Sequence, residues 1–325
     1  MKRVLVTTTS FQDTPGKHHD LLASSGWEIQ TARGPLNEDQ ILGLVGDVDA
    51  LICGDDMITR NVLEKARPRL RIISKYGIGV DKIDVNAASE LGVPVLFTPG
   101  VNHTTVAEHS FLLMLALAKH LPFHIDATRK GEWKRKTGNE IWGKTIAVVG
   151  MGRIGKEVAV RARAFGMTVL GYDLYWDAAF AEAHQVERVE SLEALWPRAD
   201  LISLHVNLSA DTRDLVCASS IAKMKKGVVI INCARGEIVK TADVVAGLES
   251  GQIGGYGTDV LDVEPPEANH PLLRHPRCIV TPHVGSRTFE SVLRQATMCV
   301  ENLRLAMAGN KPLAQVNQVP IPPAD

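Results

Sequence analysis

The sequence predicts an α/β protein in which parallel sheets are covered by helices on both faces. Short apolar runs, typical of buried strands, alternate with helical patterns along nearly the whole chain. The length of 325 residues is sufficient for two ordinary domains with substantial cores. Two long helical stretches, residues 104–121 and 288–308, divide the alternation into two series. We therefore expect two domains of the same class.

The first series contains five strand candidates joined by short helices. The helix expected over Thr59 to Ala66 begins at a capping threonine, and the helix expected over Val85 to Leu91 ends at Gly92. The strand candidates are RVLVTTT, WEIQTA, DALICG, LRIISKYG and VPVLFT.

A long helix is expected to carry the chain from the first domain to the second. It reads TTVAEHSFLLMLALAKHL and is apolar nearly all round, which indicates burial, and Pro122 interrupts it. The second series follows, with the strands KTIAVVG, TVLGYD, DLISLHV, VVIINCA, GYGTDVL and CIVTPHV. The last helix then returns the chain to the first domain. We predict a discontinuous domain of residues 1–101 and 288–325 and a second domain of residues 102–287; one large domain is the alternative.

Composition and charge exclude several classes of function. Hydrophobic residues make up 45% and charged residues 22%, as in folded globular proteins, and the formal net charge is −1. Such a charge provides no field that would draw the chain to nucleic acid or to a membrane. The most apolar segment, residues 111–118, is too short to cross a bilayer. The five cysteines show no CxxC spacing, which favours reduced thiols and a cytoplasmic location.

A glycine-rich segment follows the strand TIAVVG directly. Gly150, Gly152 and Gly155 have the spacing GxGxxG, and a helical pattern and a second strand ending at Asp173 come next. Gly150 permits a tight turn, Gly152 lets backbone amides approach a pyrophosphate, and Gly155 lets helix and strand pack. Asp173 is placed to accept hydrogen bonds from ribose hydroxyls and to repel a 2′-phosphate. The segment predicts a dinucleotide site that prefers NAD to NADP; a purely structural turn is the alternative.

Three polar residues follow strands of the second series. Arg235 follows VVIINCA, Glu264 lies beyond GYGTDVLDV, and His283 follows CIVTP. Oxidation of an alcohol by NAD needs a base for the proton, a group that orients the base, and a cation for a carboxylate or carbonyl oxygen. Singly, each is also explained as a solvated or surface-paired loop residue, but together they predict a catalytic site. The other ten of the 11 histidines, including His109 and His205, lack this combination, and their spacings predict no metal site.

Several motifs, taken in order, give the chain a resemblance to a known family. They are KYGIGVDKID, VNHTTVAEH, GKTIAVVGMGRIG, LHVNLSADTRDLV, MKKGVVIINCARGEIV, DVLDVEPP and TPHVGS. They resemble the D-isomer-specific 2-hydroxyacid dehydrogenases over nearly the whole chain, and the phosphoglycerate-dehydrogenase-like members most. The resemblance implies two Rossmann-like domains, namely a doubly wound parallel-sheet NAD-binding domain and a discontinuous flavodoxin-like substrate-binding domain. It further implies NAD-dependent interconversion of a D-2-hydroxy acid and its 2-oxo acid, and a homodimer formed through the NAD-binding domain.

The resemblance also implies roles for single residues. Arg235 anchors the substrate carboxylate, His283 is the acid/base, and Glu264 is its partner. The first domain is expected to bind the substrate through backbone amides of the turn Gly77, Ile78, Gly79 and through Lys75, for which a solvated lysine is the alternative. Further cofactor contacts implied by the family are Arg153, Ile154, Val206, Thr212, Cys233, Ala234, Asp259 and Gly285.

The chain departs from the family in one place. Phosphoglycerate dehydrogenases usually carry an arginine where this chain reads LICGDDMIT, with Cys53 and Gly54 followed by Asp55 and Asp56. Two carboxylates repel a phosphate and suit the hydroxyls of a sugar-derived acid; a solvent-facing loop is the alternative. This pattern disfavours 3-phosphoglycerate as the substrate and is compatible with a non-phosphorylated 2-hydroxy acid. D-3-phosphoglycerate dehydrogenase proper and a non-catalytic NAD-sensing protein are the alternative functions. Because the chain stops soon after its last helix, we expect no serine-sensing domain.

Overall fold

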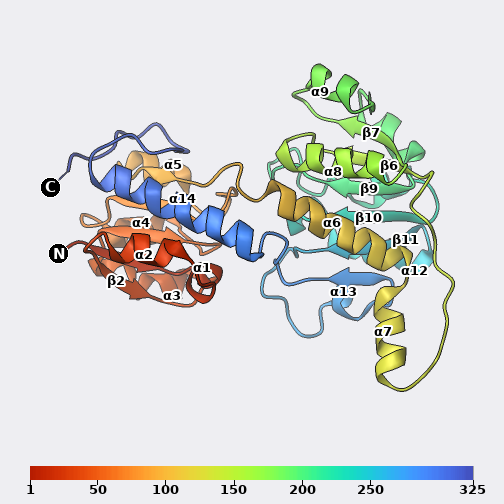
Figure 1. Cartoon of the computed structure of the whole chain (residues 1–325), viewed down its shortest axis with the longest axis horizontal. Helices are drawn as coiled ribbons and strands as arrows, with labels where there is room; N and C mark the ends of the chain where they lie inside the picture. The colour runs from red at the N-terminus through yellow and green to blue at the C-terminus, as the bar shows by residue number, and fades with distance from the viewer. Residues whose placement is uncertain (325) are drawn as a thin grey trace. The chain divides into compact units, whose positions relative to one another are not determined.

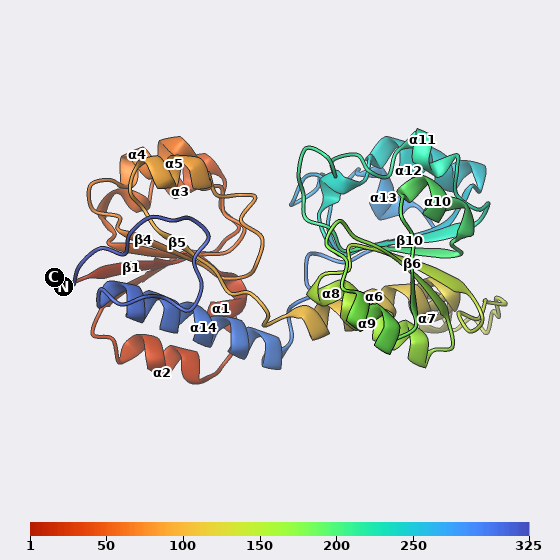
Figure 2. The ribbon, with the colours of Figure 1, turned by 90° about the horizontal axis from the view of Figure 1, so that it is seen from above.

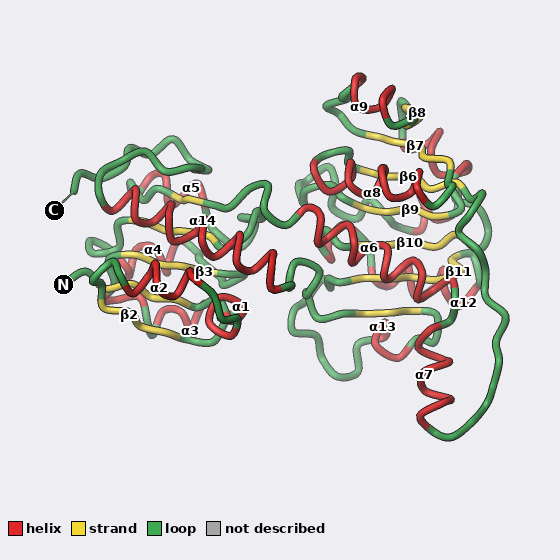
Figure 3. The backbone as a smooth tube through the Cα atoms, in the orientation of Figure 1, coloured by secondary structure: helices red, strands yellow, loops and turns green. Residues whose placement is uncertain are grey.

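Two parallel sheets organise the protein, each in its own compact unit. The computed structural model describes residues 1–324 (Figures 1 and 3). Unit 1 comprises Met1–Asn102 and the chain from Arg287 onward, and unit 2 comprises His103–Ser286. No helix within residues 1–324 is long and apolar enough to span a membrane.

The sheet of unit 1 has five parallel strands in the order β2-β1-β3-β4-β5, which is the flavodoxin-like order. Helices α3, α4 and α5 cover one face, and α1, α2 and α14 cover the other (Figure 2). A hydrophobic core lies on each face. The strands are β1 Arg3–Val6, β2 Glu28–Thr31, β3 Ala50–Cys53, β4 Ile72–Lys75 and β5 Val95–Leu96. The helices are α1 Thr9–Asp13, α2 Lys17–Ala23, α3 Glu38–Leu42, α4 Arg60–Ala66, α5 Val85–Glu90 and α14 Phe289–Met307, with a 3-10 turn at Val45–Asp47.

Local capping explains where several helices of unit 1 begin. The Thr59 hydroxyl accepts a hydrogen bond from the amide of Val62 at the start of α4, as the sequence predicts. The Thr288 hydroxyl does the same for Ser291 at the start of α14. Because α14 packs on β4, where the Ser74 hydroxyl donates to the carbonyl of Cys299 at 2.9 Å, the last helix is part of unit 1.

The sheet of unit 2 has seven parallel strands in the order β12-β11-β10-β9-β6-β7-β8. The order reverses between β6 and β9, as in doubly wound dinucleotide-binding sheets, in which ligands bind beyond the carboxyl ends of the strands at the reversal. The strands are β6 Thr145–Val149, β7 Thr168–Tyr172, β8 Val186–Arg188, β9 Leu201–Leu204, β10 Val228–Asn232, β11 Ile253–Thr258 and β12 Cys278–Val280. The prediction of two parallel-sheet α/β domains is therefore confirmed.

Helices cover both faces of this sheet over two hydrophobic cores (Figure 2). They are α6 His103–Ala118, α7 Leu121–Arg129, α8 Arg153–Ala164, α9 Ala178–Ala183, α10 Leu192–Leu195, α11 Ala218–Ile221, α12 Thr241–Ser250 and α13 Pro271–Arg274, with 3-10 turns at Trp196–Arg198 and Gly236–Ile238.

The long helix expected over residues 104–121 ends earlier than predicted. Helix α6 stops at Ala118, and His120 adopts a left-handed backbone with φ 51° before α7 begins at Leu121. Pro122 thus lies in the first turn of α7, where proline is favoured because no backbone donor is needed there. The helix is also less buried than predicted, because the Leu112 side chain is exposed.

Candidate active site

The glycine-rich turn joins β6 to α8 at the carboxyl edge of the unit 2 sheet. A Cβ atom on Gly155 would lie 1.9 Å from the carbonyl oxygen of Gly150, so helix and strand pack closely only with glycine there. Gly150 has φ +96°, and a Cβ on it would lie 2.6 Å from the carbonyl of His205. A Cβ on Gly152, in contrast, would meet nothing within 4 Å. Packing inside the protein therefore explains two of the three glycines, whereas the position of Gly152 faces open space.

The residues around Gly152 fit the phosphates of a dinucleotide. Gly152 is the N-cap of the 12-residue helix α8, and no side chain caps that end. The amides of the first helical turn thus point away from the helix without a capping acceptor, and the positive end of the helix dipole adds to their attraction for an anion. Arg153 is exposed and Ile154 is half-buried at this end.

Asp173 lies just beyond β7 and is held in place by its backbone neighbours. One carboxylate oxygen accepts from the amide of Met151 at 2.6 Å, and the other accepts from the amide of Tyr175 at 2.8 Å. The first of these bonds ties Asp173 to the glycine-rich turn. Each oxygen keeps a further lone pair, so the carboxylate remains able to accept from ribose hydroxyls.

The other predicted cofactor residues lie beyond the ends of β9 and β10. Val206 follows β9, and the Thr212 hydroxyl donates to the carbonyl of Asn207 at 2.6 Å. The amide of Ala234 donates to the Asn232 side chain at 3.0 Å. Desolvation raises the pKa of the Cys233 thiol to about 12, so it is not a thiolate nucleophile at neutral pH.

The loop that carries Arg235 packs tightly on the loop that follows β11. A Cβ on Gly236 would lie 1.9 Å from the carbonyl carbon of Leu261, so glycine is required for the contact. The Asn232 amide group donates to the carbonyl of Arg235 at 2.8 Å, and the Arg235 guanidinium donates to the carbonyl of Ala234 at 2.8 Å. The backbone that carries the guanidinium is thereby fixed.

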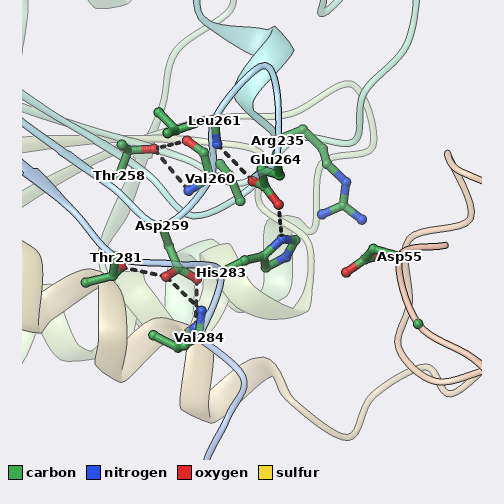
Figure 4. Close-up of polar contacts among 12 residues, drawn as sticks. Asp55, Arg235, Thr258, Asp259, Val260, Leu261, Glu264, Thr281, His283 and Val284 are labelled. Carbon is green, nitrogen blue, oxygen red and sulfur yellow. Dashed lines mark hydrogen bonds and ion pairs between the residues drawn. The ribbon is translucent and has the colours of Figure 1, made fainter. Parts of the chain in front are cut away.

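Glu264 and His283 form a hydrogen-bonded pair. Glu264 Oε2 lies 2.8 Å from His283 Nδ1, and Glu264 Oε1 accepts from the amide of Leu261 at 2.9 Å. Each side chain of the pair is 32% exposed, so the imidazole remains accessible. Because an ionised carboxylate only accepts hydrogen bonds, Nδ1 carries a proton, and Nε2 is the ring nitrogen whose proton distinguishes imidazolium from neutral imidazole. Figure 4 shows the His283 imidazole and the Arg235 guanidinium extending toward the same side from their loops.

The backbone of His283 is strained and locked. Its φ is +53°, a left-handed conformation that residues other than glycine rarely adopt. Its amide donates to the carbonyl of Asp259 at 2.9 Å and to that of Thr281 at 3.0 Å. Such a conformation persists only where the surrounding structure imposes it, so the imidazole is directed by its loop.

Asp259 is 3% exposed and directly supports this loop. Its carboxylate accepts from the Thr281 hydroxyl at 2.5 Å and from the amides of Val284 at 2.9 Å and Gly285 at 2.7 Å (Figure 4 shows the first two). Burial raises the pKa of Asp259, but hydrogen bonds from His109, Thr281 and Val284 outweigh it and leave the pKa lowered. The group is therefore an ionised carboxylate with partners inside unit 2.

His205, near the glycine-rich turn, and His283, beyond β12, differ in burial and in their capacity to carry a proton. Burial lowers the pKa of His205 to about 3, so that residue stays neutral at physiological pH. Its Nε2 lies 2.7 Å from the Ser203 hydroxyl. His283, accessible and paired with a carboxylate, is the one suited to carry a proton. Among residues 1–324, no group of three or more His, Cys, Asp or Glu side chains is arranged to hold a metal ion.

In unit 1, the predicted substrate residues lie at the end of β4 and directly after it. Lys75 is buried, and its ammonium donates to the carbonyls of Gly54 at 2.7 Å and Tyr76 at 3.2 Å and to the Asp55 carboxylate at 2.9 Å. The alternative of a solvated lysine is therefore wrong. The amide of Gly77 donates to the Thr98 hydroxyl at 2.9 Å, so Ile78 and Gly79 are the better candidates for offering amides to a ligand.

The interpretation that both Asp55 and Asp56 face a ligand is wrong for Asp56. Asp56 is fully buried and accepts from the Thr7 hydroxyl at 2.5 Å and from the amides of Leu36 at 2.7 Å and Gly54 at 3.0 Å. It is a structural residue. Asp55 is 39% exposed and is the only one of the two that a ligand can reach.

Comparison with known proteins assigns the chain to a family. Residues 111–285 match the family described as D-isomer specific 2-hydroxyacid dehydrogenase, NAD binding domain. The D-3-phosphoglycerate dehydrogenase of Methanocaldococcus jannaschii is 38% identical over 99% of this chain, which spans only 60% of that relative. The hydroxypyruvate reductase of Thermotoga maritima is 37% identical over 85% of this chain and 90% of its own length. A solved structure from Thermus thermophilus superposes with a TM-score of 0.88 at 36% identity, covering 97% of this chain and 100% of that one.

Proposed function

Because the chain belongs to the family of D-isomer-specific 2-hydroxyacid dehydrogenases, we propose that it interconverts a D-2-hydroxy acid and its 2-oxo acid with a nicotinamide cofactor. The observation that carries the proposal is the pair formed by His283 and Glu264, 2.8 Å apart, at the carboxyl edge of the sheet that also carries the glycine-rich turn. A scaffold needs no accessible proton carrier there, whereas a dehydrogenase does.

In the proposed reaction, His283 moves the proton. The nicotinamide, when bound, supplies a hydride to C2 of the oxo acid. His283 Nε2 donates a proton to the carbonyl oxygen as negative charge develops on it, and in oxidation it takes the hydroxyl proton back. Glu264 holds Nδ1–H and so keeps the ring oriented, with its charge stabilising the imidazolium.

The substrate carboxylate is assigned to Arg235. A guanidinium matches a carboxylate with two parallel hydrogen bonds, which fixes the substrate in orientation as well as in charge. The packing of Gly236 on Leu261 supports this role because it holds the arginine loop against the loop that leads to Glu264. For unit 1 we propose that the turn at Gly77, Ile78 and Gly79 contributes amides, chiefly those of the last two residues.

NAD is the proposed cofactor. Gly152 and the uncapped N-terminus of α8 suit the pyrophosphate, and the carboxylate of Asp173 suits the ribose hydroxyls. A 2′-phosphate would place its charge beside Asp173, and the next residues, Leu174 and Tyr175, supply no cation. This charge pattern favours NAD over NADP.

The proposed substrate is a small, non-phosphorylated 2-oxo acid such as hydroxypyruvate. Lys75 donates to three oxygens of its own chain, one of them a carboxylate, which leaves it poorly suited to bind a phosphate. Asp55 is partly exposed and adds negative charge near the end of β3. A carboxylate accepts hydrogen bonds from hydroxyl groups, which a hydroxylated substrate would offer. D-3-phosphoglycerate dehydrogenase activity is the second candidate, supported by the 38% identity to the enzyme of that name.

A spectrophotometric screen at 340 nm tests substrate, cofactor and class together. Hydroxypyruvate, glyoxylate, pyruvate and 3-phosphohydroxypyruvate are each offered with NADH and with NADPH. We expect hydroxypyruvate with NADH to turn over fastest. Fastest turnover of the phosphorylated acid would favour the phosphoglycerate alternative. NADH binding without turnover of any acid would favour a non-catalytic NAD-sensing protein.

His283→Gln is the decisive variant for the mechanism. We expect kcat to fall about 10²- to 10⁴-fold, because glutamine cannot supply or accept the proton, while NADH affinity stays nearly unchanged. Steady-state kinetics and NADH fluorescence titration measure the two quantities. A variant with normal kcat would remove His283 from its assigned role.

We also propose a homodimer formed through unit 2. Helices α6 and α7 and the segment after them expose large apolar side chains, which a partner surface would cover. They are Leu112, Leu121, Phe123 and Trp133, with exposed fractions of 52%, 42%, 40% and 80%. The mass in solution tests this proposal against the 35.3 kDa of one chain.

A further inference from the structure

Three polar side chains lie beneath the loop that carries His283, and one of them is a histidine that the proposed reaction does not use. His109 lies on α6, Asp259 follows β11, and Thr281 follows β12. His109 Nε2 lies 2.8 Å from the Thr281 hydroxyl and 3.4 Å from Asp259 Oδ1. The side chains of His109 and Asp259 are 11% and 4% exposed, so the cluster is largely shielded from water.

The directions of the hydrogen bonds follow from the acceptor. Asp259 Oδ1 accepts from the Thr281 hydroxyl at 2.5 Å, which uses the only proton of that hydroxyl. The Thr281 oxygen must therefore accept from His109, and Nε2 of His109 carries the donated hydrogen. The chain of donors runs from His109 through Thr281 to the Asp259 carboxylate.

The same carboxylate reaches the backbone next to His283. It accepts from the amides of Val284 at 2.9 Å and Gly285 at 2.7 Å, the two residues that follow the histidine. The loop also packs on His109 directly, since a Cβ on Gly285 would lie 2.8 Å from Asp259 Oδ2 and 3.5 Å from His109 Cδ2. These contacts fix the backbone that follows His283, and they add to the hydrogen bonds that the His283 amide itself makes while the residue holds its φ of +53°.

We propose that His109 is a positioning residue for His283. By donating to Thr281, which in turn donates to Asp259, it keeps the carboxylate oriented so that the 283–285 backbone stays in the conformation that aims the imidazole. His109 touches neither substrate nor cofactor in this proposal. The inference rests on the proposed function, because the orientation of His283 matters for catalysis only if His283 is the acid/base.

The cluster also joins the two ends of unit 2. Helix α6 begins at the first residue of the unit, His103, and Gly285 is followed by Ser286, the last residue of the unit. Both segments by which the chain enters and leaves unit 2 are therefore fastened to one carboxylate. A histidine distant in sequence from the chemistry thus acts on it through two hydrogen bonds.

Three variants and a control test the proposal in the full chain. His109→Leu removes the donor, and His109→Gln restores an N–H donor of similar reach. Thr281→Val removes the hydroxyl while keeping the side-chain shape. His184→Gln is the matched control, because the His184 ring packs on Phe180 outside the cluster.

We expect kcat to fall about 10- to 100-fold in His109→Leu and Thr281→Val, because a small misplacement of a catalytic group has effects of this size. The primary deuterium isotope effect with NADH deuterated at the transferred position should rise as the chemical step becomes rate-limiting. His109→Gln should recover most of the loss, and His184→Gln should match the parent. A merely structural role would lower the melting temperature without raising the isotope effect.

Hydrogen–deuterium exchange gives a readout that needs no turnover. Amides of residues 283–285 are bonded to Asp259 and Thr281, so a peptide covering 281–286 should exchange about tenfold faster in His109→Leu and Thr281→Val than in the control. Unchanged exchange together with unchanged kcat and isotope effect in either folded variant would overturn the proposal. If the parent protein turns over no 2-oxo acid, the proposed function fails. The exchange result still decides whether His109 holds the loop.

Discussion

The two units contain nearly the same polar arrangement at the carboxyl edges of their sheets, yet only one of these arrangements lies beneath the residue that we propose as the proton carrier. In unit 1, Asp56 accepts from one threonine hydroxyl, of Thr7, and from two backbone amides. In unit 2, Asp259 likewise accepts from one threonine hydroxyl, of Thr281, and from two backbone amides. Each carboxylate is also approached by a glycine, Gly34 or Gly285, whose Cβ would lie within 2.8 Å of it.

The difference lies in what each carboxylate is connected to. Asp259 has an additional partner, His109, and the amides that it holds follow a histidine in a left-handed conformation. Asp56 binds the amides of Leu36 and Gly54, and it closes loops that carry no such strained residue. A buried aspartate at a strand end is thus a common way to fasten loops in a parallel sheet. It becomes part of a mechanism only where the loop that it fastens carries the reacting side chain.

The largest difference between the two units should appear when the charge of each buried aspartate is removed. In Asp259→Asn, one amide hydrogen would face a donor, since both carboxylate oxygens accept, and the loop of His283 would shift. We expect kcat to fall about 100-fold, as for other misplaced catalytic groups. Asp56→Asn places the same mismatch in unit 1, so we expect a loss of about 1–3 kcal/mol of unfolding free energy with kcat changed less than about threefold.

Steady-state kinetics and urea unfolding on the same preparations measure both effects. The His109→Gln variant serves as a reference for a cluster that keeps its carboxylate. Equal losses of kcat in Asp259→Asn and Asp56→Asn would show that the two aspartates do not differ in the way proposed.

A smaller contrast should come from the two glycines. A Cβ on Gly285 would lie 2.8 Å from Asp259 Oδ2, and a Cβ on Gly34 would lie 2.5 Å from Asp56 Oδ1. Gly285→Ala therefore presses on the cluster beneath His283, and we expect kcat to fall about tenfold. Gly34→Ala should lower the melting temperature while leaving kcat close to that of the parent. A kcat as low in Gly34→Ala as in Gly285→Ala would contradict the proposal that only the aspartate of unit 2 supports the catalytic loop.

Much of the fold could be predicted because its signals are local. The cap at Thr59 and the alternating apolar runs act over a few residues, so sequence patterns identify them. The polar strand β8 was not predicted, because it has only three residues and two of them are exposed. The end of α6 was missed because His120 breaks the helix by a backbone conformation that residue type does not reveal.

The candidate site could be predicted where a charged or titratable residue lies in the loop that follows a strand. Arg235, Glu264 and His283 are of this kind, although their roles stay predictions. Sequence patterns do not identify His109, because its partner Thr281 is 172 positions away and no spacing rule links a helix residue to it. Asp55 and Asp56 look equivalent in sequence, but the first is partly exposed and the second is fully buried. Three-dimensional packing alone separates them.

The smallest expected effect concerns how the unfolding free energy depends on Asp259 at acidic pH. The pKa of Asp259 is lowered, since hydrogen bonds from His109, Thr281 and Val284 outweigh the effect of burial. A carboxyl group with a lowered folded-state pKa stabilises the fold above its unfolded-state value, about 3.9, and loses this contribution as pH falls through the folded-state value. The stability difference between the parent and Asp259→Asn should therefore be constant from about pH 5 to 7 and shrink below about pH 4.

Urea unfolding followed by tryptophan fluorescence measures this stability difference in unit 2, which holds Trp133, Trp142, Trp176 and Trp196, whereas unit 1 holds only Trp27. The carboxyl group of Asp200, whose pKa is also lowered, is present in both proteins, so their difference isolates Asp259. A difference that stays constant down to pH 3 would show that the charge of Asp259 adds nothing to the cluster, and the distinction from Asp56 would then rest on geometry alone.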